Sequence, residues 1–198
     1  METTLRLADA ADAGQIQAIY APIVSGTAIS FELEPPAVEQ ICQRIEDTLA
    51  YFPWLVCERA GGVLGYAYAG RHRARAAYQW SVDVSVYVRA DLRRSGVGRA
   101  LYTSLFEILV LQGYFNAYAG IALPNPASVG LHEAMGFKPV GVYREVGFKL
   151  GAWHDVGWWH FRLQAKPTPP MAPLDLEAVR RSPSWRDALK AGSKYLSG

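Results

Sequence analysis

The chain has 198 residues, 51% of them hydrophobic, which is enough to bury one core and too little for two full domains to be expected. Its 20 lysine and arginine residues against 18 aspartates and glutamates give a net charge of +2, too mild to indicate a nucleic-acid-binding surface. Because no apolar run approaches the length of a membrane span and the first residues lack a secretory signal, we expect a soluble, cytoplasmic protein that binds neither membrane nor nucleic acid.

The first part of the chain predicts a short strand followed by two helices. Residues 5–8 favour the strand, and apolar side chains at helical spacing up to residue 23 indicate the first helix, which Asp9 or Asp12 can cap and Gly26 ends. The second helix carries apolar residues at positions 38, 41, 45 and 49. Pro36 suits its first turn and Pro53 marks its end.

The middle of the chain predicts three strands and a helix. The apolar runs 54–58 and 63–69 are joined by Arg-Ala-Gly-Gly, which is typical of an antiparallel hairpin. Residues 79–88 alternate, so that the valines share one face of a strand and Asp83 lies on the polar face. A turn then leads into a helix that starts near Val97 and that Gly113 ends.

The last part predicts a strand at 117–122, a short helix at 126–135 and two closing strands at 140–150 and 155–163. Together the elements predict an α+β fold with a mixed, mostly antiparallel sheet flanked by helices, rather than a doubly wound one.

Proline becomes frequent from residue 166, so we expect one domain over residues 1–165 and a Pro-rich extension over 166–198. Residues 184–190 can form one capped helix in this extension. The extension is too short for a core of its own, and it either packs on the domain, packs on a partner subunit or stays mobile.

The two cysteines and four histidines do not predict a metal site, because they lack the spacing of zinc ligands. Cys42 falls on the apolar side of a predicted helix and Cys57 inside a predicted strand. Both are therefore predicted to be buried small hydrophobic residues rather than nucleophiles.

Residues 93–98, Arg-Arg-Ser-Gly-Val-Gly, join a predicted strand to a predicted helix. This order gathers backbone N–H groups at the positive end of a helix, where they can bind a polyanion. Gly96 and Gly98 would let a diphosphate approach the backbone, and the nearby arginines add positive charge. The third glycine of a Rossmann site and the GKS or GKT of a P-loop are missing. Without further context, a glycine turn with solvated arginines explains these residues equally well.

The same six residues resemble the Arg/Gln-x-x-Gly-x-Gly/Ala signature of the GNAT acetyltransferases, whose loop amides hold the diphosphate of coenzyme A. Residues 125–137, Asn-Pro-Ala-Ser-Val-Gly-Leu-His-Glu-Ala-Met-Gly-Phe, are similar to the second coenzyme A segment of that family, Asn-x-x-Ser-x-x-Leu-x-x-x-x-Gly-Phe. Two motifs in the correct order are far more specific than one. The likeness runs over about residues 5–163, and it narrows to the phosphinothricin and methionine sulfone or sulfoximine acetyltransferases through segments 51–56, 67–70, 77–80, 86–88, 123–125, 132–134, 147–149 and 153–157.

The resemblance implies a GNAT-type fold with acetyl-CoA as the co-substrate. It also implies that the strand of residues 79–88 splays from its neighbour, which leaves main-chain N–H groups free to polarise the thioester carbonyl and hold pantetheine. Asn125 either bonds the pantetheine arm or caps the following helix, because one side-chain oxygen cannot do both at once. The predicted cofactor-binding residues are Val86, Tyr87, Val88, Arg93, Arg94, Ser95, Gly96, Val97, Gly98, Arg99, Asn125 and Ser128.

Acetyl transfer to an ammonium group requires removal of a proton, and two side chains are candidates for catalysis. Asp83 can take the proton directly or through water; the subgroup generally has Glu here, and the shorter Asp favours a bridging water. The alternative role for Asp83 is structural: its carboxylate would pair with an arginine or cap a bulge. His132 resembles the His of the subgroup's His-Glu-Ala motif, proposed to assist proton transfer. The alternative role for His132 is to pack beside the cofactor or to bond a backbone carbonyl. We rank Asp83 above His132 as the base.

Three arginines precede the strand of the proposed base. Arginine binds a carboxylate through two parallel hydrogen bonds, so Arg73 and Arg75 are candidates for the α-carboxylate of the acceptor, with Tyr78 as a further donor. Arg71 is expected to be solvated. The candidates for apolar walls of the acceptor pocket are Phe31 and Trp153.

The resemblance thus implies metal-free acetyl transfer from acetyl-CoA to the amino group of phosphinothricin, methionine sulfone, methionine sulfoximine or a similar small molecule, by direct attack in a ternary complex. Acetylation of a peptide N-terminus, polyamine or aminoglycoside is one alternative. A non-catalytic acyl-CoA sensor, in which Asp83 and His132 are structural, is another. The resemblance also implies a homodimer, and the aromatic segment 153–161 is a candidate interface.

Overall fold

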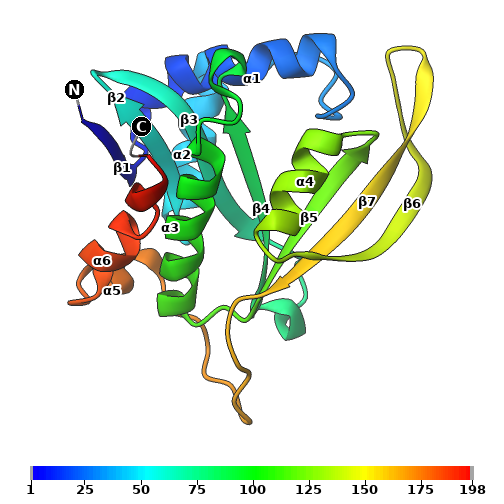
Figure 1. Cartoon of the computed structure of the whole chain (residues 1–198). Coiled ribbons are helices and arrows are strands. Elements are labelled where there is room, and N and C mark those ends of the chain that lie inside the picture. The colour runs from blue at the N-terminus through cyan, green and yellow to red at the C-terminus, as the bar shows by residue number, and fades with distance from the viewer. Residues whose placement is uncertain (1, 197–198) are drawn as a thin grey trace.

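A seven-stranded sheet forms the centre of the computed structural model, which describes residues 2–196 (Figure 1). The strands lie in the order β1-β2-β3-β4-β5-β7-β6; β4 and β5 are parallel, and the other neighbours pair antiparallel. The predicted α+β class with a mixed, mostly antiparallel sheet is confirmed. The strands are β1 (Thr3–Leu7), β2 (Trp54–Arg59), β3 (Gly62–Arg71), β4 (Ser81–Val88), β5 (Asn116–Leu123), β6 (Lys138–Lys149) and β7 (Ala152–Arg162).

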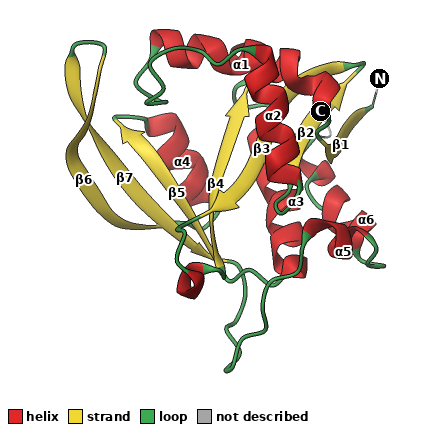
Figure 2. Cartoon of the chain, turned by 180° about the vertical axis from the view of Figure 1, so that it is seen from behind, coloured by secondary structure: helices red, strands yellow, loops and turns green. Residues whose placement is uncertain are grey.

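Helices cover both faces of the sheet, with α3 in front in Figure 1 and α2 in front in the reverse view of Figure 2. Successive side chains of β2 point to opposite faces of the sheet, and this is why two cores form. Leu55 and Cys57 pack into a core with α3, whereas Trp54 and Val56 pack on the other side with α1 and α2. The helices are α1 (Ala13–Gly26), α2 (Val38–Leu49), α3 (Val97–Gln112), α4 (Pro126–Ala134), α5 (Leu176–Arg180) and α6 (Trp185–Lys190).

The starts of the first two helices differ slightly from the predictions. Asp9 accepts a hydrogen bond from the N–H of Ala11 at 2.8 Å and caps a short 3₁₀ helix, after which α1 begins. The second helix begins two residues after Pro36, so the predicted place of this proline in the first turn is wrong. Ala37 takes the N-cap position because the side chain of Gln40 accepts its N–H at 2.8 Å.

The two cysteines lie in different surroundings. Cys57 is fully buried in β2, as predicted, and burial raises the pKa of its thiol to about 11, so the thiol stays protonated near neutral pH. Cys42 is only half-buried on α2, which corrects the prediction of a buried residue there.

The parallel strands β4 and β5 diverge after a short contact. Their register runs only from Ser81, opposite Asn116, to Asp83, opposite Tyr118. Beyond that point β5 stays paired with β7 while β4 stays paired with β3. The splay that the resemblance implies is therefore present: a wedge opens between the two strands, and Asp83 lies at its apex.

The C-terminal extension packs on the α3 face of the molecule (Figure 1). The predicted helix at 184–190 is α6, which starts at Trp185. The sequence did not predict α5, a five-residue helix that Asp175 caps by accepting the N–H of Ala178 at 2.7 Å. Leu176, Val179 and Ala188 are buried, so the extension contributes to the core. Within residues 2–196, no helix is both long and apolar enough to cross a membrane.

Candidate active site

Asp83 forms a close pair with His72, a residue that sequence reasoning did not assign to the site. The β3–β4 register places Gly70 opposite Asp83, so the chain just beyond the end of β3 passes the carboxylate. His72 Nδ1 lies 2.6 Å from Asp83 Oδ1. The His72 side chain is 12% exposed and that of Asp83 is 35% exposed, so the carboxylate keeps one open side.

Aromatic residues hold the imidazole of His72 in place. Its ring stacks on Tyr118 of β5, with 4.4 Å between the centroids and 16° between the planes. Tyr78 and Trp158 meet the same ring edge-on at 6.0 and 6.1 Å. The orientation of His72, and with it that of Asp83, is therefore fixed by packing from both sides of the wedge.

The environment of Asp83 suits a base. Burial raises the pKa of the Asp83 carboxyl above its ordinary value, while the hydrogen bond from His72 and the positive charge of Arg73 oppose the rise. A carboxylate with a raised pKa takes up a proton more readily than a solvated one. This property favours the removal of a proton from an amine.

His132 lies on the opposite face of the sheet, in contact with the α3 core. It is 4% exposed, and burial lowers its pKa, so the ring is neutral. Its Nδ1–H donates to the carbonyl of Ser128 at 2.8 Å, and its Nε2 accepts from the hydroxyl of Tyr102 at 2.9 Å. The structure does not bring His132 and Asp83 together.

The glycine-rich loop after β4 has the backbone features of an anion site. Arg94 and Gly96 have positive φ angles of 65° and 84°, and Gly96 is the N-cap residue of α3, where no side chain caps the helix. The first N–H groups of α3 are thus not capped by a side chain. The arginines of the loop, Arg93, Arg94 and Arg99, are all exposed.

The two glycines of the loop face different surroundings. A Cβ atom on Gly98 would crowd packed side chains, 3.2 Å from Leu131 of α4 and 3.6 Å from Val88 of β4. A Cβ atom on Gly96 would instead overlap the carbonyl oxygen of Tyr195 in the C-terminal extension. Gly98 therefore lets the start of α3 pack closely against α4 and β4, whereas Gly96 makes room for the extension. The sequence interpretation had assigned both glycines to a diphosphate.

The second motif forms the start of α4. The side-chain oxygen of Asn125 accepts the N–H of Ser128 at 3.2 Å, so this oxygen caps the helix. Ser128 Oγ lies 3.3 Å from His132 Nδ1.

On the other side of the wedge, Val86, Tyr87 and Val88 have no partner in the register between β4 and β5. Strand N–H groups that alternate toward this open edge are available for a ligand.

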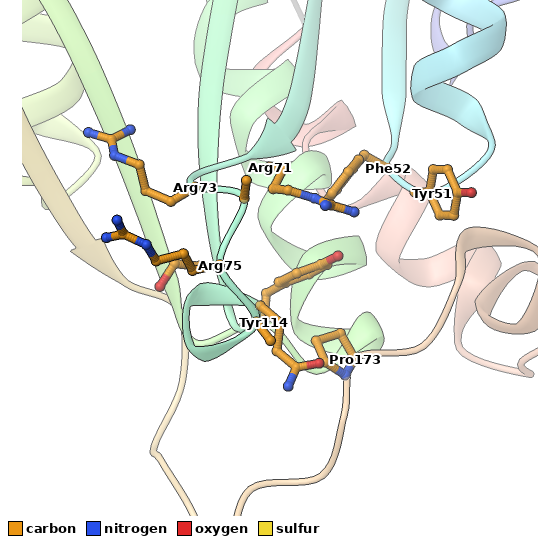
Figure 3. A pocket seen from close by; sticks show the side chains of 11 residues that line it. Tyr51, Phe52, Arg71, Arg73, Arg75, Tyr114 and Pro173 are labelled. Carbon is orange, nitrogen blue, oxygen red and sulfur yellow. The ribbon is translucent and has the colours of Figure 1, made fainter.

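The arginines at and just after the end of β3 line a cavity of about 440 Å³, together with Tyr51, Phe52, Tyr114 and Pro173. Figure 3 shows the side chain of Arg71 extending toward Phe52, while Arg73 and Arg75 extend to the opposite side. Arg73 donates to the carbonyl of His72 at 2.7 Å, and its guanidinium lies over the ring of Trp158 at 5.5 Å. Arg73 and Tyr78 thus lie beside the pair of His72 and Asp83.

The two residues predicted as apolar walls are in different places. Phe31 packs against Gly147 of β6 so closely that a Cβ atom on Gly147 would overlap its ring, and it lies 6.3 Å from the ring of His154. Trp153 is 61% exposed and pairs with Phe148 near the tip of the β6–β7 hairpin.

The chain is similar to known acetyltransferases in sequence and in structure. The family model described as an acetyltransferase (GNAT) domain matches residues 5–158. The chain is 41% identical over 167 residues to a phosphinothricin N-acetyltransferase of Streptomyces viridochromogenes, which covers 83% of this chain and 91% of that protein. It is 36% identical over 173 residues to an L-methionine sulfoximine/L-methionine sulfone acetyltransferase of Pseudomonas aeruginosa, which covers 86% of this chain and 100% of that protein.

The solved structures that superpose on this chain include acetyltransferases as well. A phosphinothricin acetyltransferase from Sinorhizobium meliloti in complex with acetyl-CoA superposes with a TM-score of 0.80 at 32% identity, over 87% of this chain and 94% of that chain. An acetyltransferase from Salmonella typhimurium, solved with its cofactor acetyl-CoA, superposes with a TM-score of 0.82 at 31% identity, over 87% of this chain and 100% of that chain.

Proposed function

The chain belongs to the GNAT family of acetyltransferases, and on this premise we propose that it transfers the acetyl group of acetyl-CoA to the free amino group of a small amino-acid-like molecule. Phosphinothricin, methionine sulfone and methionine sulfoximine are the proposed substrates, since relatives that share more than a third of their residues with this chain carry these names. The observation that carries the proposal is the position of Asp83, a partly buried carboxylate at the apex of the wedge between β4 and β5.

The residues around the wedge fit coenzyme A. Gly98 lets the start of α3 approach α4 and β4 closely, and the start of α3 offers N–H groups that no side chain caps. We assign the diphosphate to the N–H groups of residues 96–99 and the surrounding arginines, since the N–H of Ser95 already donates to the carbonyl of Leu92 at 3.3 Å. Pantetheine is assigned to the open edge of β4 at Val86, Tyr87 and Val88. Acetyl-CoA supplies an acetyl group activated as a thioester.

Asp83 is proposed to accept the proton of the substrate ammonium, directly or through one water. His72 is proposed as a positioning residue, because its hydrogen bond to Oδ1 leaves the other carboxylate oxygen free for that proton. The stack of His72 on Tyr118 prevents the carboxylate from turning away from the wedge.

The α-carboxylate of the acceptor is assigned to Arg73 and Arg75, with Tyr78 as a further donor. Arg73 is already oriented by Trp158 and by the carbonyl of His72, so less side-chain entropy is lost when it binds a carboxylate. The arginine-rich surroundings also favour an anionic acceptor over a polyamine or an aminoglycoside.

His132 has both ring nitrogens occupied within the core, which supports the alternative interpretation in which it ties α4 to α3. Its role in proton transfer stays a prediction. Steady-state kinetics of His132→Gln test it: loss of activity together with thermal stability supports a packing role, and loss of kcat at unchanged stability supports proton transfer.

We also propose a homodimer that uses the β6–β7 hairpin. The hairpin projects beyond the body of the molecule (Figure 2). Among its exposed apolar side chains, Val140, Phe148 and Trp153 are each more than half exposed, at 62%, 57% and 61%. The proposed interface therefore lies mainly on β6 and on Trp153, because Trp159 is buried and Trp158 packs beside the active site.

A turnover assay with a panel of amines tests the function. Purified protein and acetyl-CoA are incubated with methionine sulfone, phosphinothricin, a peptide with a free N-terminus, spermidine and an aminoglycoside, and release of the coenzyme thiol is followed. We expect the highest kcat/KM on the two amino-acid analogues. Binding of acetyl-CoA without turnover on any amine would identify a sensor, and preference for spermidine would contradict the assigned carboxylate site.

A further inference from the structure

The C-terminal extension reaches the glycine-rich loop that we assign to the coenzyme. Its last described turn, a 3₁₀ helix over Ser193–Tyr195, lies directly beside the N-terminus of α3. This segment follows the part of the chain that matches the family model, which ends at residue 158.

Two close backbone contacts dock this segment on α3. Gly96 has no room for a Cβ atom because the carbonyl oxygen of Tyr195 occupies that position. Gly192 has none because the backbone of Ala100 does. The N–H of Gly192 also donates to Ser104 Oγ at 3.0 Å inside the core. Contacts that require a glycine on each side indicate a built interface rather than a tail lying on the surface.

The side chain of Tyr195 completes the interface. The guanidinium carbon of Arg99 lies 4.2 Å from the centroid of the Tyr195 ring. A guanidinium that stacks by its face keeps the N–H donors along its edge free, and such a fork binds phosphate through parallel hydrogen bonds. Arg99 occupies the first turn of α3, next to the N–H groups assigned to the diphosphate.

We propose that the C-terminal extension is part of the coenzyme site and that Tyr195 is a positioning residue, which holds the Arg99 guanidinium toward the phosphates of acetyl-CoA. This inference rests on the proposed role of the glycine-rich loop. It assigns the extension a function in cofactor affinity, and it leaves the acceptor pocket and the Asp83 base unaffected.

The inference predicts that affinity for acetyl-CoA depends on the Tyr195 ring and on Arg99 as one unit. Tyr195→Leu keeps the backbone contact with Gly96 and an apolar side chain but loses the ring. Tyr195→Phe keeps the ring and serves as the matched control. A cation–π contact of ordinary strength corresponds to about a 3- to 10-fold change in a dissociation constant.

The test is a titration of full-length variants with acetyl-CoA by calorimetry, combined with steady-state kinetics. We expect Tyr195→Leu to raise the Kd and KM for acetyl-CoA about 3- to 10-fold, with kcat and the KM for the amine within about twofold of wild type, and Tyr195→Phe to bind like wild type. Arg99→Gln should weaken binding, and Tyr195→Leu should add nothing in that background.

Two outcomes overturn the inference: Tyr195→Leu binds acetyl-CoA as tightly as wild type or more tightly, or it weakens binding equally when Arg99 is already replaced. Gly98→Val, which places a branched side chain at the start of α3 against Leu131 and Val88, separates this failure from a failure of the loop assignment. If Gly98→Val folds and abolishes binding while Tyr195→Leu changes nothing, the loop assignment stands and the inference is wrong. If Gly98→Val folds and binds acetyl-CoA like wild type, the loop assignment itself is wrong.

Discussion

His72 and Asp83 are joined by a 2.6 Å hydrogen bond across the end of the β3–β4 hairpin, at the apex of the wedge between β4 and β5. The pair places a partly exposed carboxylate beside Arg73, whose positive charge lowers the pKa of that carboxyl. The proposed base and the arginines proposed to bind the acceptor thus lie on the same short stretch of chain.

Replacement of His72 should shift the pH dependence of the reaction. The hydrogen bond from His72 lowers the pKa of Asp83, so its loss lets burial raise that pKa further. Because the base must be deprotonated, the acidic limb of the kcat/KM profile should move to higher pH. His72→Phe is the suitable variant, since it keeps the stack on Tyr118. A profile superimposable on that of wild type would show that His72 does not influence the base.

Gly147 should tolerate no side chain. A Cβ atom there overlaps the ring of Phe31, so Gly147→Ala must displace either Phe31 or β6, at a cost of about 1–3 kcal/mol in the free energy of unfolding. Gly141→Ala, in the same strand and with open space around its Cβ position, is the matched control. Urea unfolding measures both. In the background of Phe31→Ala the cost of Gly147→Ala should shrink, and an undiminished cost would place the strain elsewhere.

Lys149 should contribute to stability by satisfying two carbonyl groups. Its buried ammonium donates to the carbonyls of Val24 and Ser30, at 2.6 and 2.7 Å, and joins β6 to the end of α1. Lys149→Met leaves both carbonyls without this donor and should lower the free energy of unfolding by about 1–3 kcal/mol. The exposed Lys138→Met in the same strand is the control. Equal unfolding midpoints for the two variants would contradict this role.

The proposed dimer should dissociate when charge is placed on the exposed hairpin. Phe148→Glu should yield a monomer in light scattering coupled to size-exclusion chromatography, because a charge within an apolar interface is strongly unfavourable. Leu33 is an exposed apolar residue outside the hairpin, 76% exposed, so Leu33→Glu should leave the mass unchanged. A wild-type protein that elutes as a monomer would contradict the proposed interface.

Most of the sheet could be predicted because local patterns determine it. The alternation of valines with Asp83 and its polar neighbours fixed which face of β4 carries the carboxylate, and the strand-to-helix glycine loop located the start of α3. The hairpin of β2 and β3 followed from its turn residues. Each of these signals lies within a dozen or so residues of the chain.

The pair of His72 with Asp83 depends on register and not on local pattern. The segment between β3 and β4 carries no two-residue turn that fixes pairing, so the sequence did not show that His72 returns to the carboxylate. The contact of Gly96 with Tyr195 joins distant parts of the chain. No pattern in the residues next to either position predicts that contact. The short helix α5 was missed because five residues give too little periodicity.

The most direct test of the proposed chemistry is the kcat/KM of Asp83→Asn on methionine sulfone or phosphinothricin across the pH range, with binding of acetyl-CoA measured on the same protein. Asn keeps the size of the side chain but cannot accept the proton, so kcat/KM should fall about 10²- to 10⁴-fold while the Kd for acetyl-CoA stays near that of wild type. Asp47→Asn, an exposed substitution on α2, should change neither quantity. If Asp83→Asn retains wild-type kcat/KM at every pH, Asp83 is not the base.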